Sequence, residues 1–203
     1  LKSDWNYVKF NMDVFLVDFL SYLMGSIPFG YLLTKIFLKK DIRNIGSGNI
    51  GATNVLRTGN KMIGYSTLCL DILKAVIPLL FIKFNLPDII YISSLCIFLG
   101  HVFPIWLKFK GGKGVATFVG ILFCLNYILG FVFIISWFSI FLIFKFSSLS
   151  SIVASFVIPI FHVFYFDNNN YYFFIILFIL IFYTHRENVK RLINNAESKT
   201  KIY

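Results

Sequence analysis

The residues that could do chemistry lie in three short polar segments of an otherwise apolar chain. The segment from Phe109 to Thr117 is the most distinctive, because it combines two lysines with three glycines: Lys110, Gly111, Gly112, Lys113 and Gly114. Glycine lets neighbouring backbone N–H groups turn toward one point, and lysine adds positive charge there. Lysines alone would also anchor helix ends at lipid headgroups. The three glycines favour a binding site for phosphate or another oxyanion.

The first polar segment along the chain runs from Gly46 to Arg57, ahead of the second at Phe109 to Thr117, and it consists mainly of small residues, amides and hydroxyls. Such a composition is typical of a turn followed by a helix N-terminus, an arrangement that favours anions. A flexible loop with an ordinary helix cap is the alternative interpretation. The length of the run and its terminal arginine favour the anion site. The candidate residues are Ser47, Gly48, Asn49, Thr53, Asn54 and Arg57.

The third polar segment, from His185 to Arg191, follows the last long apolar run. His185 and Asn188 are three residues apart, so on a helix they share a face and could contact one ligand. The alternative is a basic collar whose long side chains reach the membrane surface. The placement of all three segments relative to the membrane decides between these interpretations.

The composition indicates a membrane protein. Of the 203 residues, 58% are hydrophobic and 14% are charged, whereas a soluble domain carries about 25% charged residues. A membrane-spanning helix needs about 20 apolar residues. We predict an all-α integral membrane protein, a single polytopic domain over 1–203 with a polar N-terminal extension (1–13) and a cytoplasmic tail (198–203). Its seven transmembrane helices are expected at 14–38, 64–83, 88–107, 114–127, 129–146, 150–166 and 171–184.

The basic residues predict the orientation of these spans. When the seven spans alternate, most of the 19 lysines and arginines fall on one side of the membrane. By the positive-inside rule this side is cytoplasmic, so the N-terminus is outside and the C-terminus is cytoplasmic. The net charge of +10 therefore reflects topology, and we expect no nucleic-acid partner. All three polar segments share the cytoplasmic side.

The run from Val115 to Phe144 is short for two spans and long for one. Asn126 and Gly130 are its candidate turn residues. A single span would put the basic C-terminus on the side opposite the other basic loops. We therefore predict two short helices here.

Ionisable residues inside spans are costly to bury in lipid and need an explanation. Asp71 and Lys74 lie three residues apart in the second span, so we predict a structural ion pair. Asp18, in the first span, has no evident partner in the sequence. The three cysteines, Cys69, Cys96 and Cys124, fall in apolar runs and are predicted to be small buried side chains.

The three segments, in this order, resemble the motifs of the bacterial membrane acyl-phosphate:glycerol-3-phosphate acyltransferases (PlsY type). The matching runs are Gly46 to Asn54 with Arg57, Gly100-His101 with Pro104 and Phe109 to Thr117, and His185 to Asn188. Two local departures are Thr184, where the family often has arginine, and Asn195-Ala196, which replaces a usual glycine-centred turn. The resemblance covers about residues 14 to 197.

This resemblance implies a seven-helix enzyme of the bacterial inner (cytoplasmic) membrane with its active site on the cytoplasmic face. It implies transfer of a fatty acyl group from acyl phosphate to the 1-hydroxyl of sn-glycerol 3-phosphate, giving lysophosphatidic acid and inorganic phosphate for phospholipid biosynthesis. No acyl-CoA, metal or cofactor is expected. The expected partners are the two substrates, the lipid bilayer and the enzyme that makes acyl phosphate.

Residue roles follow from this chemistry, because a site that gathers two phosphates should be rich in cations and glycine N–H groups. The proton acceptor is either a protein group or a phosphate oxygen of the substrate. His101 is either catalytic support or a structural hydrogen-bonding group. We assign Ser47, Lys113, His185 and Asn188 to catalysis, and we assign Gly48, Asn49, Thr53, Asn54, Arg57, His101, Lys110, Gly111, Gly112 and Gly114 to substrate binding.

A small anion transporter or channel with a cytoplasmic phosphate gate is the alternative function. It would need similar polar groups near the membrane midplane or on the outer face, and this chain has few of them. A non-catalytic membrane scaffold would leave the glycine-rich segments unexplained.

Overall fold

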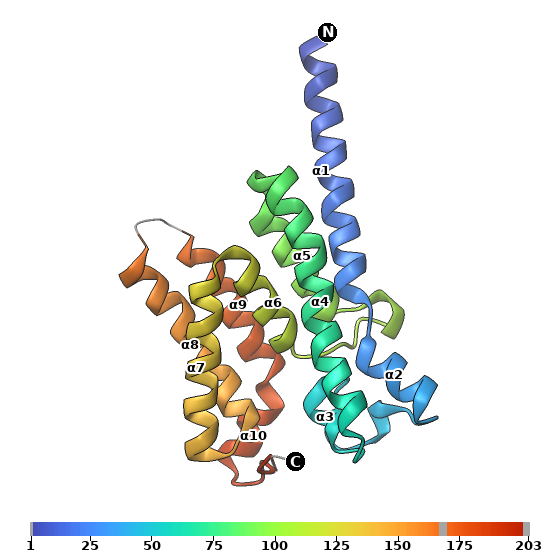
Figure 1. Cartoon of the computed structure of the whole chain (residues 1–203), viewed down its shortest axis with the longest axis vertical. Coiled ribbons are helices and arrows are strands. Elements are labelled where there is room, and N and C mark those ends of the chain that lie inside the picture. Colours follow the sequence, from blue (N-terminus) through green and yellow to red (C-terminus); the bar gives the residue numbers. More distant parts are fainter. Residues whose placement is uncertain (1, 167–169, 201–203) are drawn as a thin grey trace.

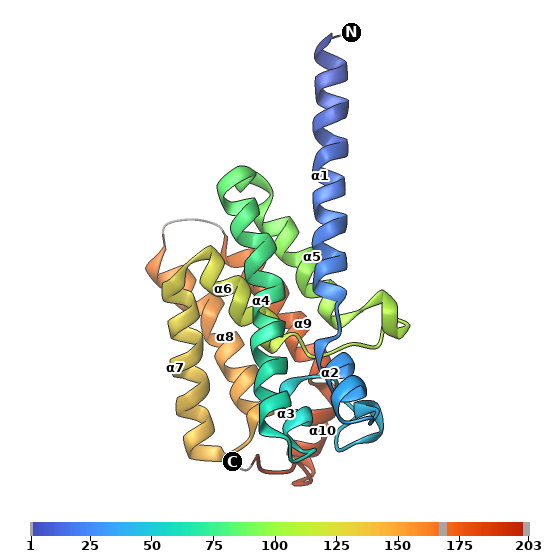
Figure 2. The same cartoon turned by 45° about the vertical axis from the view of Figure 1, so that its right-hand side comes forward.

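The computed structural model describes residues 2–166 and 170–200, and these residues form helices and turns without a β-strand. In Figures 1 and 2 the first helix (Lys2–Ser26) extends beyond the other helices. The helices are α1 (Lys2–Ser26), α2 (Phe29–Phe37), α3 (Ala52–Leu56), α4 (Lys61–Asn85), α5 (Ile90–Val102), α6 (Val115–Leu125), α7 (Tyr127–Phe144), α8 (Ser147–Tyr165), α9 (Tyr171–Thr184) and α10 (Arg186–Ile193). Three 3-10 turns join them: η1 (Ile42–Asn44), η2 (Pro87–Ile89) and η3 (Ile105–Leu107).

The first predicted span, 14–38, contains two helices that are bent by 40° relative to each other. Pro28 lies between α1 and α2, and it has no backbone N–H with which to continue the hydrogen bonding of α1. The bend carries α2 and the loop after it to the side of α4, against which α2 packs. The break therefore helps to position the first polar segment.

Asp18 has a partner on the neighbouring helix. The hydroxyl of Ser93, on α5, donates to Asp18 Oδ1 at 2.5 Å. The hydroxyl of Tyr22 donates to the backbone carbonyl of Phe103 at 2.7 Å, near the end of α5. These two bonds tie α1 to α5, which is its main packing partner.

The predicted turn at Asn126 is confirmed. Asn126 separates α6 from α7, and its Oδ1 accepts the N–H of Ile128 at 2.9 Å. The side-chain oxygen satisfies a backbone donor that the start of α7 would otherwise leave free. The short helix α6 packs against α4 on one side and α7 on the other.

The predicted all-α class is confirmed, and several helices are suited to a membrane. In the described residues, three stretches can cross a bilayer by length and composition: Pro87–Leu107, α7 and α8. The bent pairs α1–α2 and α9–α10 raise the number to as many as five. Helix α6 is apolar but has only 11 residues. The count of seven spans stays a prediction.

A small second core lies beneath the polar loops. It consists of buried aliphatic residues from η1, the following loop, α3, α4 and η3: Ile42, Ile50, Val55, Ile63 and Leu107. Four partly buried residues pack around them: Tyr31, Leu33, Leu38 and Ile45. Burying apolar area here is favourable by about 25 cal/mol per Å². Because this core joins η3 to the Gly46–Arg57 segment, it holds the first two polar segments next to each other.

Candidate active site

The first polar segment is shaped by the buried side chain of Asn54. Its amide nitrogen donates to the carbonyls of Ile45 at 2.9 Å and Asn49 at 2.8 Å, and its Oδ1 accepts the N–H of Ser47 at 2.9 Å. Gly46 has a φ of +56°, and a Cβ there would lie 2.4 Å from Asn54 Oδ1, so this turn requires glycine. Asn54 therefore organises the loop around itself with its own hydrogen bonds.

The second polar segment is attached to the end of α5. The N–H groups of Gly111 and Gly112 donate to the carbonyls of Val102 and His101, each at 3.1 Å. A Cβ on Gly112 would lie 2.0 Å from His101 Nε2, so the loop passes directly against the imidazole. These N–H groups are engaged and cannot cradle a phosphate, which differs from the predicted substrate-binding role of both glycines. Their role in the structure is to place the loop that carries Lys113.

Lys113 is half-buried beside other charged groups. Burial lowers the pKa of Lys113 to about 8, with the carboxylate of Glu197 opposing this change and the cations Arg191 and Arg57 adding to it. The backbone carbonyl of Lys113 accepts a hydrogen bond from the hydroxyl of Thr184 at 3.1 Å. Thr184, which stands where the acyltransferase motif often has arginine, thus connects the loop to the end of α9.

His185 is buried at the junction of α9 and α10. Its Nδ1 lies 2.8 Å from the carbonyl oxygen of Ile181. A carbonyl can only accept, so Nδ1 carries the hydrogen, and in the neutral ring Nε2 keeps a free lone pair. Nε2 is therefore the ring nitrogen that can accept a hydrogen bond.

Glu197 connects the third segment to α8, although sequence analysis assigned it no role. Its Oε1 accepts hydrogen bonds from Asn188 Nδ2 and Ser148 Oγ, both at 2.7 Å, and its Oε2 accepts one from Arg191 Nε at 2.7 Å. Burial alone would raise the pKa of Glu197, but these hydrogen bonds outweigh it and hold the pKa below its usual range. Asn195 takes a left-handed conformation with a φ of +53°, as a glycine would, and turns the tail back.

The three segments meet at a cavity of about 630 Å³. Of the predicted site residues, the lining includes Ser47, Asn49, Thr53, Asn54, Arg57, His101, Lys113, Gly114, His185 and Asn188. It does not include Gly48, Lys110, Gly111 or Gly112, and Lys110 is exposed outside it. Arg57 reaches across to the tail, where its Nη2 donates to Ser198 Oγ at 2.9 Å.

One wall of the cavity is mainly apolar. It is formed by side chains of α4, α6 and α7, including Leu68, Ile72, Val119, Phe133, Ile134, Trp137 and Phe138. The cavity therefore combines cations and hydrogen-bonding groups with a surface suited to a hydrocarbon chain. Such a site fits a ligand that has a charged head and an apolar tail.

The predicted ion pair between Asp71 and Lys74 is confirmed, with Lys74 Nζ 2.8 Å from Asp71 Oδ1. Lys74 also donates to the carbonyl of Ile27 at 2.8 Å, at the break between α1 and α2. Asp71 lines the cavity, and its Oδ1 lies 3.7 Å from His101 Nδ1. The pair thus ties α4 to the break at Pro28, and His101 at the end of α5 lies next to it.

Comparison with known proteins agrees with this arrangement. The family model described as glycerol-3-phosphate acyltransferase matches residues 15–195. A glycerol-3-phosphate acyltransferase of Pelagibacter ubique is 69% identical over 192 residues, which cover 95% of this chain and 100% of that protein. One from Bartonella henselae is 46% identical over 198 residues, covering 95% of this chain and 94% of that protein.

Two crystal structures of PlsY (YgiH), an integral membrane glycerol 3-phosphate acyltransferase, have the same fold. The glycerol 3-phosphate form matches with a TM-score of 0.87 and 37% identity, covering 93% of this chain and 96% of the other. The lysophosphatidic acid form matches with a TM-score of 0.83 and 37% identity, covering 92% and 95%. The resemblance inferred from the three motifs is confirmed: the chain belongs to the glycerol-3-phosphate acyltransferase family and is an acyltransferase.

Proposed function

We propose that this enzyme transfers a fatty acyl group from acyl phosphate to the 1-hydroxyl of sn-glycerol 3-phosphate, giving lysophosphatidic acid and inorganic phosphate in phospholipid biosynthesis. The observation that carries the proposal is the cavity, where the cations Arg57 and Lys113 share one space with the apolar side chains Phe133 and Trp137. An acyl phosphate has the same division between an anionic head and a hydrocarbon tail. The two ligand forms of the related crystal structure support the acceptor and the product.

The side chains of the cavity have distinct roles in this proposal. Arg57 and Lys113 bind the phosphate groups, and Ser47 adds a hydroxyl at the same end. The free lone pair of His185 Nε2 accepts the hydrogen bond of the acceptor hydroxyl. Asn188, held by Glu197, orients the acceptor beside it.

The chemical step needs no strong base. The 1-hydroxyl oxygen attacks the acyl carbonyl carbon and forms the ester bond, while the bond from that carbon to the phosphate oxygen breaks. The hydroxyl proton leaves with the departing phosphate. Because a mixed anhydride already has a good leaving group, positioning by His185 and charge stabilisation by Lys113 are the main contributions of the protein.

The proposal also includes the arrangement in the membrane. Seven spans with an outside N-terminus would put all three polar segments on the cytoplasmic face of the bacterial inner membrane. There glycerol 3-phosphate arrives from water and the acyl donor from the lipid phase. An enzyme that makes acyl phosphate is the partner that would supply the donor.

The experiment is an assay of purified protein with acyl phosphate and labelled glycerol 3-phosphate. We expect labelled lysophosphatidic acid from the unmodified chain. For Lys113→Ala we expect a rate at least about 100-fold lower, which is the loss typical when a charge-stabilising group is removed. Lys108→Ala, an exposed lysine of the same loop that does not line the cavity, should keep its activity. Absence of product, or equal use of acyl-CoA as donor, would refute the proposal.

A further inference from the structure

A second hollow lies beside the cavity and opens to the surface. It has a volume of about 450 Å³ and is lined by Lys40, Asp41, Asn44, Ile45, Arg57 and Thr58. Arg57 lines both spaces. The chain also continues directly from Asn44 and Ile45 in the hollow to Gly46 and Ser47 in the cavity. The two spaces are therefore neighbours, and the side chain of Arg57 lies between them.

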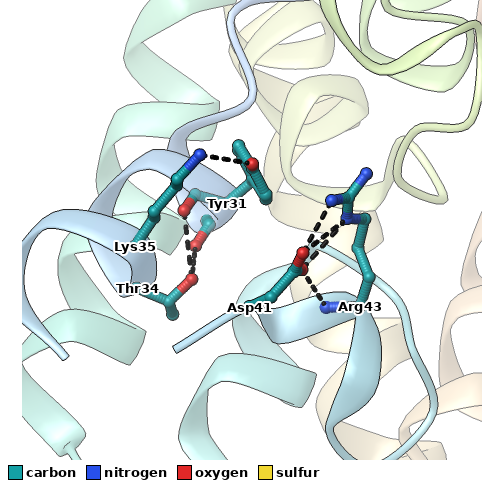
Figure 3. A network of polar contacts seen from close by, with 6 residues as sticks. Tyr31, Thr34, Lys35, Asp41 and Arg43 are labelled. Atoms are coloured by element: carbon teal, nitrogen blue, oxygen red, sulfur yellow. Dashed lines mark hydrogen bonds and ion pairs between the residues drawn. The ribbon is translucent and has the colours of Figure 1, made fainter. Parts of the chain in front are cut away.

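The hollow has a net positive charge, although it contains one carboxylate. Asp41 is engaged by Arg43, whose Nε lies 3.0 Å from Asp41 Oδ1 and whose Nη2 lies 2.6 Å from Oδ2 (Figure 3). The side-chain hydrogen bond from Arg43 lowers the pKa of Asp41 to about 2, so the carboxylate stays ionised and paired. Lys40 and Arg57 remain to attract an anion.

The structure holds the backbone of Lys40 in place at the end of α2. The N–H groups of Leu38 and Lys40 both donate to the carbonyl of Thr34, at 3.0 and 3.3 Å, and Lys39 between them has a φ of +54°. The buried hydroxyl of Thr34 in turn donates to the carbonyl of Gly30 at 2.7 Å. Lys40 lines the hollow whereas its exposed neighbour Lys39 does not.

We propose that this hollow is a capture site for a phosphate monoester dianion arriving from water, which Lys40 attracts and Arg57 then receives at the edge of the cavity. The inference rests on the proposed function, in which that monoester is glycerol 3-phosphate. The apolar side chains of the cavity, on α4, α6 and α7, do not line this hollow, so the water-soluble substrate would enter past polar groups and the lipid substrate along the apolar side chains. Inorganic phosphate, the product, shares the same chemistry, so the test below distinguishes capture of the substrate from release of phosphate.

The test compares Lys40→Gln with Lys39→Gln, which removes the same charge one residue away. For Lys40→Gln we expect kcat/KM for glycerol 3-phosphate to fall by about threefold to tenfold at low ionic strength, with kcat unchanged at saturation. The ratio of kcat/KM between the unmodified enzyme and Lys40→Gln should approach one at about 0.5 M salt, because salt screens exposed charges. Lys40→Arg should restore kcat/KM, and Lys39→Gln should leave it unchanged.

Three results would overturn the capture site. Equal losses in Lys39→Gln and Lys40→Gln would mean that only overall charge matters. A loss that does not depend on salt would mean that Lys40 acts on the fold. A lower kcat for Lys40→Gln, together with altered product inhibition by inorganic phosphate, would assign the hollow to phosphate release. Failure of the unmodified enzyme to form product would refute the proposed function itself, independently of these variants.

Discussion

The charge of Lys113 depends on its surroundings, because its pKa lies near the working pH of most enzymes. Burial puts its pKa at about 8, and the nearby Arg57 and Arg191 lower it further while Glu197 opposes them. A phosphate dianion bound beside Lys113 would stabilise the ammonium and raise this pKa. Binding therefore favours the protonated lysine, so affinity for phosphate is complete below pH 8 and is lost as the pH rises above it.

We predict that the Kd of the enzyme for glycerol 3-phosphate rises above pH 8, by up to about tenfold for each pH unit, because the charged fraction of Lys113 falls by that factor. Calorimetric titration of the purified protein between pH 7 and 9.5 would measure the Kd. Lys113→Arg keeps its charge throughout this range and should give a flat profile. Parallel profiles for the two proteins would assign the effect to another group.

Residue types and spacing predicted several of the polar side chains that line the cavity, but not the hydrogen bonds of the loop glycines. Ser47, Arg57, Lys113 and His185 stand out because polar residues are rare in this chain. The bonding of the Gly112 N–H depends on how the loop packs against α5, which no local pattern shows. The role of Glu197 was also not evident from the sequence, because its three hydrogen-bonding partners come together only when the tail folds back.

At the scale of elements, the helix ends and loops position the site. Pro28 and Asn126 mark helix breaks that local chemistry explains, and the break at Asn126 was predicted from the sequence. The contact between the second polar segment and α5 was not predictable. It depends on how closely Gly112 approaches His101, where a Cβ on residue 112 would lie 2.0 Å from the imidazole Nε2. A close approach of this kind leaves no periodic signal in the sequence.

We predict that Gly112→Ala destabilises the protein by about 1–3 kcal/mol and lowers activity, because the added methyl would overlap the imidazole of His101. Thermal unfolding in detergent would measure the change in Tm. Gly51→Ala is the matched control, because the nearest atom to its added Cβ would be Asn49 Oδ1 at 3.1 Å, compared with 2.0 Å for Gly112→Ala. The double variant Gly112→Ala/His101→Ala should regain stability relative to Gly112→Ala, and no regain would exclude this overlap as the cause.

At the scale of the whole molecule, composition predicted the helical membrane class, and the asymmetry of basic residues predicted its orientation. The number of spans is harder to predict, because α6 has 11 residues and α4 carries the buried pair of Asp71 and Lys74. The first feature makes α6 shorter than a typical span of about 20 residues, and the second places two charged residues within a predicted span. Helix α6 packs against α4 and α7.

We predict that the loop after α4 is outside the cell and that the tail after α10 is cytoplasmic. Cysteines would be introduced as Asn85→Cys or Lys199→Cys in a variant whose three native cysteines are replaced. A membrane-impermeant maleimide should label Asn85→Cys in intact cells, and it should label Lys199→Cys only after the membrane is opened. The reverse pattern would contradict the orientation.

The path of the tail also has a consequence for biosynthesis. Ala196, Glu197, Ser198 and Thr200 line the cavity, more than 130 residues after the first segment at Gly46 to Arg57. A ribosome adds about 5–20 residues per second, so both earlier polar segments are synthesised seconds before the tail emerges. During that interval the cavity lacks His185, Asn188 and the Ser198 partner of Arg57. If His185 and Asn188 act as proposed, we expect partly synthesised chains to be inactive until the last helices have been inserted.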